Sequence, residues 1–202
     1  MTRVPYLSDV DLPEADRPLL YPSTMPRLLL QPSASQPVPE RPANLYRALA
    51  NSPEGLRHFS VLGRWIQRGC ELPARLRELA ILQVGYLTKT PYQWSHHVKI
   101  GRDVGLTDED IRSVCAATAG EDHDLDELET LVLQASREIT VNLRMSEQTW
   151  SQLHPLLGVP RLLDLTLIIS HCNAVARILG TLGIDVEPEF QPCLQEFPLP
   201  PG

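Results

Sequence analysis

The sequence predicts an all-α protein, a helical bundle with proline-rich arms at both ends. Apolar residues recur at helical spacing through most of the stretch from 44 to 182. Val, Ile and Thr never alternate with polar residues over a useful length, so no strand is expected. We therefore expect an extended arm over residues 1–42, a helical domain over 43–185 and a tail over 186–202.

Most of the expected helices have recognisable ends. Pro53 follows the N-cap residue Ser52, and Gly69 and Gly105 offer C-terminal positions for two helices. Thr107 stands three residues before an acid, the spacing of a capping box. The expected helices are 44–51, 53–68, one from Pro73 to a break at 88–91, 92–104, one capped by Thr107, 127–141 capped by Asp124, a short one capped by Ser146, and a long one from Pro160 to about Leu182.

The two arms are rich in proline. Residues 1–42 carry nine prolines and residues 187–202 carry five. Because proline fixes φ and lacks an N–H donor, both arms are expected to be extended rather than helical. Apolar residues within them indicate that they lie along the domain or along a partner subunit. The candidate anchors are Tyr6, Leu19, Leu20, Tyr21, Leu28 to Leu30, Phe190 and Phe197.

Charge and composition exclude several classes of function. A formal charge of −7 argues against nucleic-acid or anionic-membrane partners, because no basic stripe neutralises phosphates. No apolar run reaches the ~20 residues that span a bilayer, and no export signal is evident. The four cysteines are far apart and form no CxxC, which is typical of reduced thiols. We therefore expect a cytoplasmic protein.

Glu78 and His97 form the main candidate site. They lie 19 residues apart on successive predicted helices, close enough for a helical hairpin to bring both side chains into one pocket. A carboxylate and an imidazole in such a pocket can transfer protons without a cofactor. Two structural alternatives stay open: a surface acid paired with Arg75 or Arg77, and a core histidine with no chemical role.

Further polar and aromatic residues surround His97 in the sequence. Gln93 and Trp94 share a helix face with it, whereas His96 is turned by about 100°. His171, on the last long helix, either adds a polar group to the pocket or has a buried structural role. No HExxH, GxSxG or GxGxxG occurs, so we expect neither a metal site nor a nucleotide cofactor.

Three segments in register resemble the carboxymuconolactone decarboxylase and alkyl hydroperoxidase D superfamily. They are R-E-L-A-I-L at 77–82, the histidine motif at 97–106 and the capped helix start at 107–114, and the resemblance extends over 43–185. The resemblance implies that Glu78 and His97 form a proton relay. Tyr92 stands where the family has a further residue of that relay. The thiols of the peroxidase branch would fall at positions 90 and 93, which are Thr90 and Gln93 here.

The resemblance to the thiol-free branch implies a cofactor-independent decarboxylase, lyase or isomerase. Its substrate would be a small cyclic or aromatic-derived carboxylate or another enolisable molecule. His97 would transfer the proton, Glu78 would orient it, and Tyr92 would donate to developing negative charge. Trp94, Gln93, His96 and His171 would bind the substrate, with Arg102 and Arg177 as candidate carboxylate clamps.

Two other functions stay open at this point. One is a peroxidase or peroxiredoxin-like antioxidant that uses a displaced cysteine such as Cys172. The other is a non-catalytic helical oligomer that has kept the fold. The resemblance also implies a homo-oligomer, a dimer, trimer or hexamer, in which the arms occupy grooves.

Overall fold

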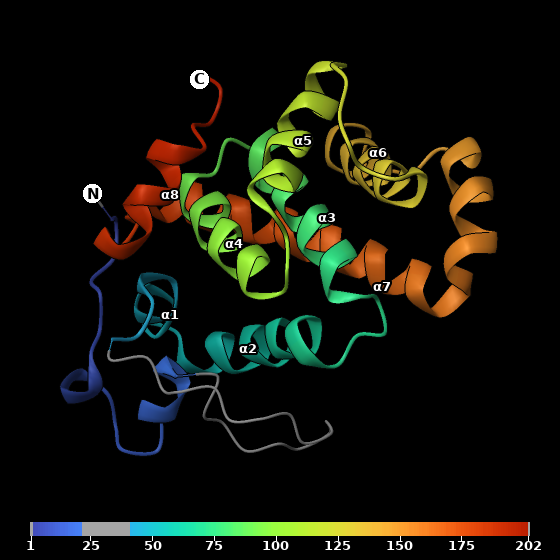
Figure 1. The fold of residues 1–202 in the computed structure, drawn as a ribbon. Helices are drawn as coiled ribbons and strands as arrows, with labels where there is room; N and C mark the ends of the chain where they lie inside the picture. Colours follow the sequence, from blue (N-terminus) through green and yellow to red (C-terminus); the bar gives the residue numbers. More distant parts are fainter. Residues whose placement is uncertain (1, 22–40, 202) are drawn as a thin grey trace. The chain divides into compact units, whose positions relative to one another are not determined.

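The computed structural model describes residues 2–21 and 41–201, and in these ranges the protein is helical with no strand (Figure 1). The all-α prediction is confirmed. The elements are η1 (Asp9–Asp11), η2 (Arg17–Leu20), α1 (Asn44–Leu49), α2 (Pro53–Arg68), α3 (Ala74–Leu87), α4 (Pro91–Asp103), α5 (Asp108–Ala119), α6 (Glu127–Asn142), α7 (Glu147–Leu182), η4 (Pro188–Phe190) and α8 (Gln191–Glu196), where η marks a 3₁₀ helix.

The helix ends follow the predicted signals with one correction. Thr107 caps α5 through the expected box, in which its hydroxyl accepts from the Asp110 amide. The cap of α6 is Asp126 rather than Asp124, because its carboxylate accepts from the Glu129 amide and the Glu129 carboxylate accepts in return. Asp124 also stands three residues before a glutamate, so spacing alone does not distinguish the two pairs.

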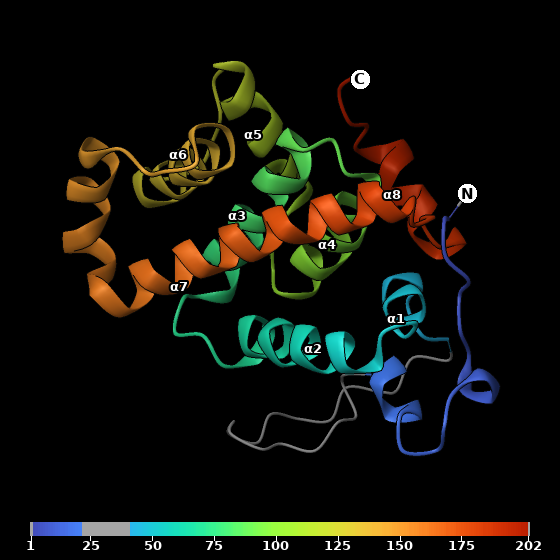
Figure 2. The ribbon, with the colours of Figure 1, turned by 180° about the vertical axis from the view of Figure 1, so that it is seen from behind.

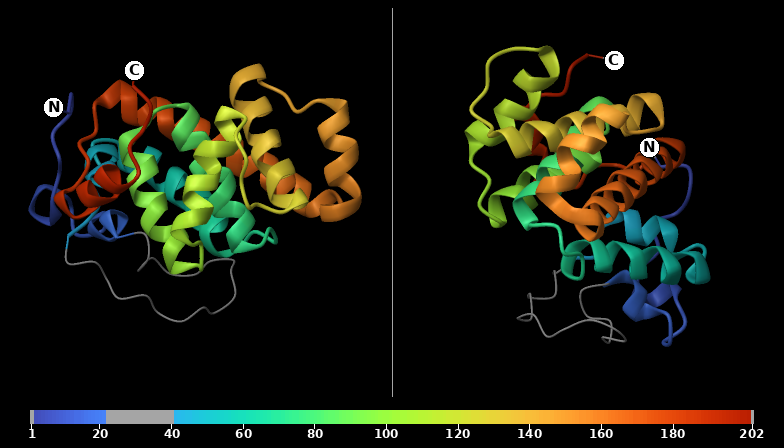
Figure 3. Two further views of the ribbon diagram at one scale, coloured as in Figure 1. Left: turned by 45° about the horizontal axis from the view of Figure 1, so that its top comes forward. Right: turned by 90° about the vertical axis from the view of Figure 1, so that its right-hand side faces the viewer.

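Helix α7 contains both of the last two predicted helices. Its two parts meet at a bend at Gly158, whose φ of 70° lies in the left-handed region (Figure 3). Pro155 and Pro160 flank the bend, which agrees with the interruption that prolines impose on a helix. By length and composition α7 is the candidate membrane span among the described residues, and 39% of its most apolar stretch is buried inside the protein.

The chain divides into two compact units. The first comprises Met1–Cys70 with Leu182–Glu187, and the second comprises Glu71–Thr181 with Pro188–Gly202. This division follows packing and differs from the arm, domain and tail expected from composition. The predicted domain boundaries stay a prediction.

The described part of the N-terminal arm packs within the first unit. Leu19 and Leu20 are buried beside residues of α1 and α2, which confirms them as anchors. The arm is not fully extended, because η1 and η2 interrupt it. The expected anchors Leu28 to Leu30 lie outside the described residues.

The second unit is built around α3, which packs against α4, α5 and α6. Seen from behind, the second part of α7 passes in front of α3 and α4 (Figure 2). The tail is not simply extended, because its residues form η4 and α8, and α8 packs on α4. Phe197 is buried in the core as predicted. The core residues are Leu79, Leu82, Trp94, Val98, Leu106, Ile111, Val114, Leu125, Leu133, Cys193 and Phe197.

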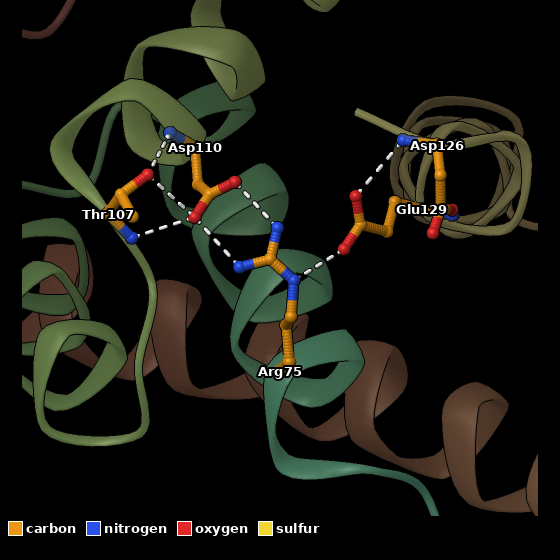
Figure 4. Close-up of polar contacts among 5 residues, drawn as sticks. All are labelled: Arg75, Thr107, Asp110, Asp126 and Glu129. Carbon is orange, nitrogen blue, oxygen red and sulfur yellow. Dashed lines mark hydrogen bonds and ion pairs between the residues drawn. The ribbon is translucent and has the colours of Figure 1, made fainter. Parts of the chain in front are cut away.

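Arg75 joins α3 to two neighbouring helices (Figure 4). Its Nη1 and Nη2 donate to the two carboxylate oxygens of Asp110 at 2.7 and 2.6 Å, and its Nε donates to Glu129. The same two acids close the capping boxes of Thr107 and Asp126. The hydrogen bonds from Arg75 lower the pKa of Asp110 to about 2. Two helix starts are therefore held to α3 by one guanidinium.

Candidate active site

Helices α3 and α4 form the hairpin that carries the candidate site. A turn at 88–90 joins them, with Lys89 in the left-handed region at φ 49°. A Cβ on Gly85 would lie 3.4 Å from the backbone nitrogen of Trp94, so the two helix backbones approach closely there. Gly101 of α4 packs against Leu106, not against α3. The close packing at Gly85 brings the earlier part of α3 against the later part of α4.

Glu78 and His97 meet across this hairpin. His97 Nδ1 lies 2.6 Å from Glu78 Oε2, and Arg77 Nε donates to the other carboxylate oxygen at 2.9 Å. The Glu78 side chain is fully buried, whereas 16% of the His97 side chain is exposed. The carboxylate is therefore held inside the protein while the imidazole keeps a route to a ligand.

The surface-acid alternative for Glu78 does not match this geometry. Arg75 pairs with Asp110 and Glu129 instead, and Arg77 shares Glu78 with His97. Burial by itself raises the pKa of Glu78, but the positive charges and hydrogen bonds of His97 and Arg77 outweigh it. The net pKa lies below the ordinary value, so the carboxylate is ionised at neutral pH.

Gln93 lies one helical turn before His97 on the same face of α4. It is only 3% exposed, and neither atom of its side-chain amide has a hydrogen-bond partner among the described residues. Thr90, three residues earlier, caps the helix without a side-chain hydrogen bond to its first turn. Thr90, Gln93 and His97 thus follow one another along one stripe.

The other predicted residues of α4 lie elsewhere. Tyr92 stacks on His96 with ring centroids 4.2 Å apart, and His96 stacks on Phe190 at 3.7 Å. Trp94 is fully buried in the core, and its Nε1 donates to the Phe197 carbonyl at 2.8 Å. It supports α4 rather than lining a pocket. His96 and His97 diverge, as their adjacency requires.

Helix α7 brings Cys172 near Glu78 and also carries His171. Cys172 is buried, and burial together with the nearby Glu78 carboxylate raises the pKa of its thiol far above the ordinary value. Burial lowers the pKa of the half-buried His171. All four cysteines of the chain are free, as expected.

A cavity of about 420 Å³ opens beside the start of α4. Three hydroxyls, an amide and the guanidinium of Arg177 line it, and none of its lining residues within the described ranges is acidic. Arg177 uses one nitrogen to reach the Asn173 carbonyl at 2.6 Å. Arg102, the other candidate clamp, is paired with Asp108 and Glu196 instead. The lining residues are Leu87, Thr88, Thr90, Thr140, Val141, Asn173, Ala176 and Arg177.

Sequence reasoning named Arg177 but missed Thr88 and Thr140. Both hydroxyls reach the cavity because the ends of α3 and α6 lie beside α7, a packing that no local pattern indicates. Within residues 2–21 and 41–201, no three His, Cys, Asp or Glu side chains gather in a way that would hold a metal ion.

Residues 55–122 match the sequence model of the carboxymuconolactone decarboxylase family, and this segment includes Glu78 and His97. A search of curated proteins found no match. Among solved structures, an uncharacterised peroxidase-related protein from Ralstonia eutropha with an alkylhydroperoxidase AhpD core is 15% identical, with a TM-score of 0.74 and coverage of 94% of each chain.

Two further structures are similar. A peroxidase-related protein from Silicibacter is 16% identical with a TM-score of 0.66, over 74% of this chain and 79% of that one. A Cys-to-Ala variant of the debrominase Bmp8 in complex with 2,3,4-tribromopyrrole is also 16% identical, with a TM-score of 0.75 and coverage of 97% of each chain. At these identities the likeness shows the shared helical fold. The matched segment, residues 55–122, is similar to the carboxymuconolactone decarboxylase family over about a third of the chain.

Proposed function

We propose that the protein is a cofactor-independent acid/base enzyme, a decarboxylase, lyase or isomerase. Its substrate is a small cyclic or aromatic-derived carboxylate or another enolisable molecule. His97 transfers the proton, and Glu78 orients the imidazole. The observation that carries this proposal is the 2.6 Å contact between His97 Nδ1 and a Glu78 carboxylate that is fully buried.

Because Nδ1 of His97 contacts Glu78, the two nitrogens of the imidazole ring have different roles in the proposed chemistry. Nδ1 is engaged by Glu78, which fixes the ring orientation and offsets the charge that His97 acquires with a proton. Nε2 is then the atom that exchanges protons with substrate. Because Glu78 lies within the core and is held by Arg77, the pair is preorganised before substrate arrives.

The proposed chemistry needs no redox partner. In isomerisation, Nε2 of His97 removes a proton from the carbon beside a carbonyl, the C–H electron pair forms an enolate, and His97 returns the proton to another carbon. In decarboxylation, the C–C bond to the carboxylate breaks, CO₂ leaves, and the electron pair forms the enolate. Protonated His97 then donates to carbon.

The cavity beside Thr90 supports a carboxylate-bearing substrate. Arg177 is its one lining cation, and three threonine hydroxyls and Asn173 offer further polar contacts. Because no described lining residue is acidic, the carboxylate of a bound substrate would not be repelled by a negative charge of the protein.

The thiol chemistry of the peroxidase branch has less support. Thr90 and Gln93 occupy the positions where the resemblance places the two thiols. Cys172 lies near Glu78, but burial raises the pKa of its thiol, which disfavours the nucleophilic thiolate. The relay pair is therefore better suited to proton transfer than to peroxide reduction.

A ligand bound to one of the similar structures supports the proposed substrate class. The debrominase binds 2,3,4-tribromopyrrole, so a small ring is known as a ligand of this fold.

Helix α7 carries a stripe of exposed apolar residues. Val159, Leu163 and Leu167, each about half exposed, form this stripe at four-residue spacing. We propose that this stripe joins copies of the chain in a homo-oligomer, and that the enzyme acts in the cytoplasm, where its free thiols stay reduced.

The test is deuterium incorporation from D₂O into a panel of cyclic enol lactones and cyclic β-keto acids, followed by NMR together with CO₂ release. The native protein is expected to accelerate exchange or decarboxylation of at least one compound, and His97→Asn is expected to abolish that acceleration. Full activity in a folded His97→Asn protein would overturn the proposal.

A further inference from the structure

The side-chain amide of Gln93 is an unusual group in this protein. Gln93 is only 3% exposed, and neither the oxygen nor the nitrogen of its side-chain amide has a hydrogen-bond partner in the described part of the chain. The other unpartnered buried side-chain atoms there, Ser60 Oγ and His123 Nδ1, are single atoms. A buried donor and a buried acceptor left unpaired are both costly, so a partner from outside the chain is expected.

The position of Gln93 indicates what that partner is. The amide stands about 6 Å before His97 along the axis of α4, on the same face. Thr90, one turn earlier on that face, already lines the cavity of about 420 Å³. Gln93 and His97 are not among the lining residues of this cavity, but a ligand that extended from Thr90 along this face toward His97 would meet Gln93.

The chemistry of an amide narrows the choice of ligand. Its carbonyl oxygen accepts and its NH₂ donates in one plane, so its complement is a planar group with a donor beside an acceptor. A lactam, or the enol form of a cyclic 1,2- or 1,3-dicarbonyl compound, presents such an edge. The amide carries no charge, so it selects this edge by hydrogen-bond pattern.

We propose that Gln93 is the recognition group of the relay site and that it pairs with a small cyclic ligand bearing a lactam or enol–carbonyl edge. This inference rests on the proposed function, because it names the ligand class of the same site. The NH₂ group donates to the ligand carbonyl whose oxygen gains charge during enolisation, and Oε1 accepts from the ligand N–H or O–H. The ligand ring is thereby held against His97.

The experiment uses two probes that differ in one donor: 2-pyridone, and N-methyl-2-pyridone, which has lost the N–H. The Gln93 side-chain NH₂ resonance of the ¹⁵N-labelled full chain is assigned by its absence in Gln93→Met. Titration with 2-pyridone is expected to shift it, and the N-methyl compound is expected to bind at least tenfold more weakly. Gln93→Met should lose 2-pyridone binding, whereas Gln148→Met, at an exposed glutamine of α7, should keep it.

Thermal unfolding supplies a second readout. Gln93→Met and Gln93→Leu remove the unpaired amide, so the ligand-free variants are expected to melt at or above the native temperature and to lose the stabilisation that 2-pyridone gives. The proposal is overturned if 2-pyridone leaves the resonance unchanged, as a resident water partner would predict. Equal binding of both probes, or 2-pyridone binding that survives in Gln93→Met, overturns it as well.

The same titration on His97→Asn separates this inference from the proposed function. Recognition by Gln93 predicts that 2-pyridone still binds there, although proton exchange is lost. If the probe binds through Gln93 but exchange persists in His97→Asn, the proposed function fails and the recognition site stands. If His97→Asn abolishes exchange but the probe never binds, the inference alone fails.

Discussion

Gly85 of α3 lies against the backbone of Trp94 in α4, where a Cβ would stand 3.4 Å from the Trp94 nitrogen. Trp94 is anchored in turn by its hydrogen bond to the Phe197 carbonyl. This contact sets the register of the hairpin, and with that register Glu78 and His97 come within 2.6 Å of each other. The candidate chemistry therefore depends on a packing contact that lies seven residues from Glu78 along α3 and three residues from His97 along α4.

Substitution of the relay pair should reduce activity without unfolding the protein. On a substrate found in the exchange screen, His97→Asn is expected to lower kcat/KM by about 10²- to 10⁴-fold, the usual contribution of a general acid or base. Glu78→Gln should lower kcat in the same direction by leaving the imidazole without its charged partner. The control is His58→Asn, whose imidazole is 80% exposed, and it should leave kcat/KM unchanged. Equal losses in all three variants would contradict the assignment.

Acid should destabilise the protein partly through Glu78. The pKa of Glu78 lies below its ordinary value of 4.5 in the folded state, so its contribution is complete above pH 4.5 and is lost as pH falls through the folded pKa. Urea unfolding at pH 6, 4.5 and 3.5 is expected to show a falling free energy of unfolding. Glu78→Gln should be less stable by about 3 kcal/mol at pH 6 and should show a shallower decline. Glu109→Gln, at a 62% exposed acid, should keep the native slope.

Loss of Arg75 should loosen the starts of two helices at once. Arg75→Met leaves the carboxylates of Asp110 and Glu129 without their shared cation, and we expect a loss of roughly 2 kcal/mol in the free energy of unfolding. Arg112→Met removes a 55% exposed arginine and should change it by less than about 0.5 kcal/mol. Chemical denaturation of the two variants makes the comparison, and equal effects would refute the role of Arg75.

Cys172 should be unreactive in the folded protein. Burial and the Glu78 carboxylate raise the pKa of its thiol, so little thiolate is present at pH 8. Mass spectrometry after iodoacetamide treatment should find Cys172 unlabelled in buffer and labelled in urea, whereas the half-buried Cys70 and Cys115 are labelled first. Dilute peroxide should likewise leave Cys172 a thiol. Rapid, reversible oxidation of Cys172 would revive the peroxidase alternative.

The apolar stripe on α7 should control assembly. Light scattering after size-exclusion chromatography is expected to give an oligomer for the native protein and a single chain for the double variant Leu163→Glu and Leu167→Glu. Arg161→Glu changes an exposed neighbour on the same helix and should leave the oligomer intact. A native protein that elutes as a single chain would rule out this assembly.

The sequence predicted the helices well because their signals are local. Periodic apolar residues, the Thr107 box and the glycine at 105 each act within one turn, and the structure places helices accordingly. It did not predict α8, because six residues are too few to show a period, and their helix forms where Cys193 and Phe197 are buried. The bend within α7 lies at Gly158, between the two helices that the sequence predicts there. Pro155 and Pro160 stand on the two sides of this glycine.

The site was predictable to a smaller extent. The spacing of Glu78 and His97 indicated their meeting, because two helices joined by a short turn pack side by side. It did not indicate that Trp94 would belong to the core, since a helix face shows periodicity but not which neighbour covers it. Thr88 and Thr140 lie far apart in the chain, and only the packing of the ends of α3 and α6 beside α7 brings them to one cavity.

The burial of Phe197 and Cys193 beside Leu79 and Trp94 also bears on how the chain folds during synthesis. The core of the second unit lacks its last side chains until position 197 has emerged from the ribosome. The core of the first unit, by contrast, is formed by residues between 7 and 59, all of which are made before α7. Although α3 and α4 are made early, the core of the second unit is therefore complete only after translation has passed α7 and α8.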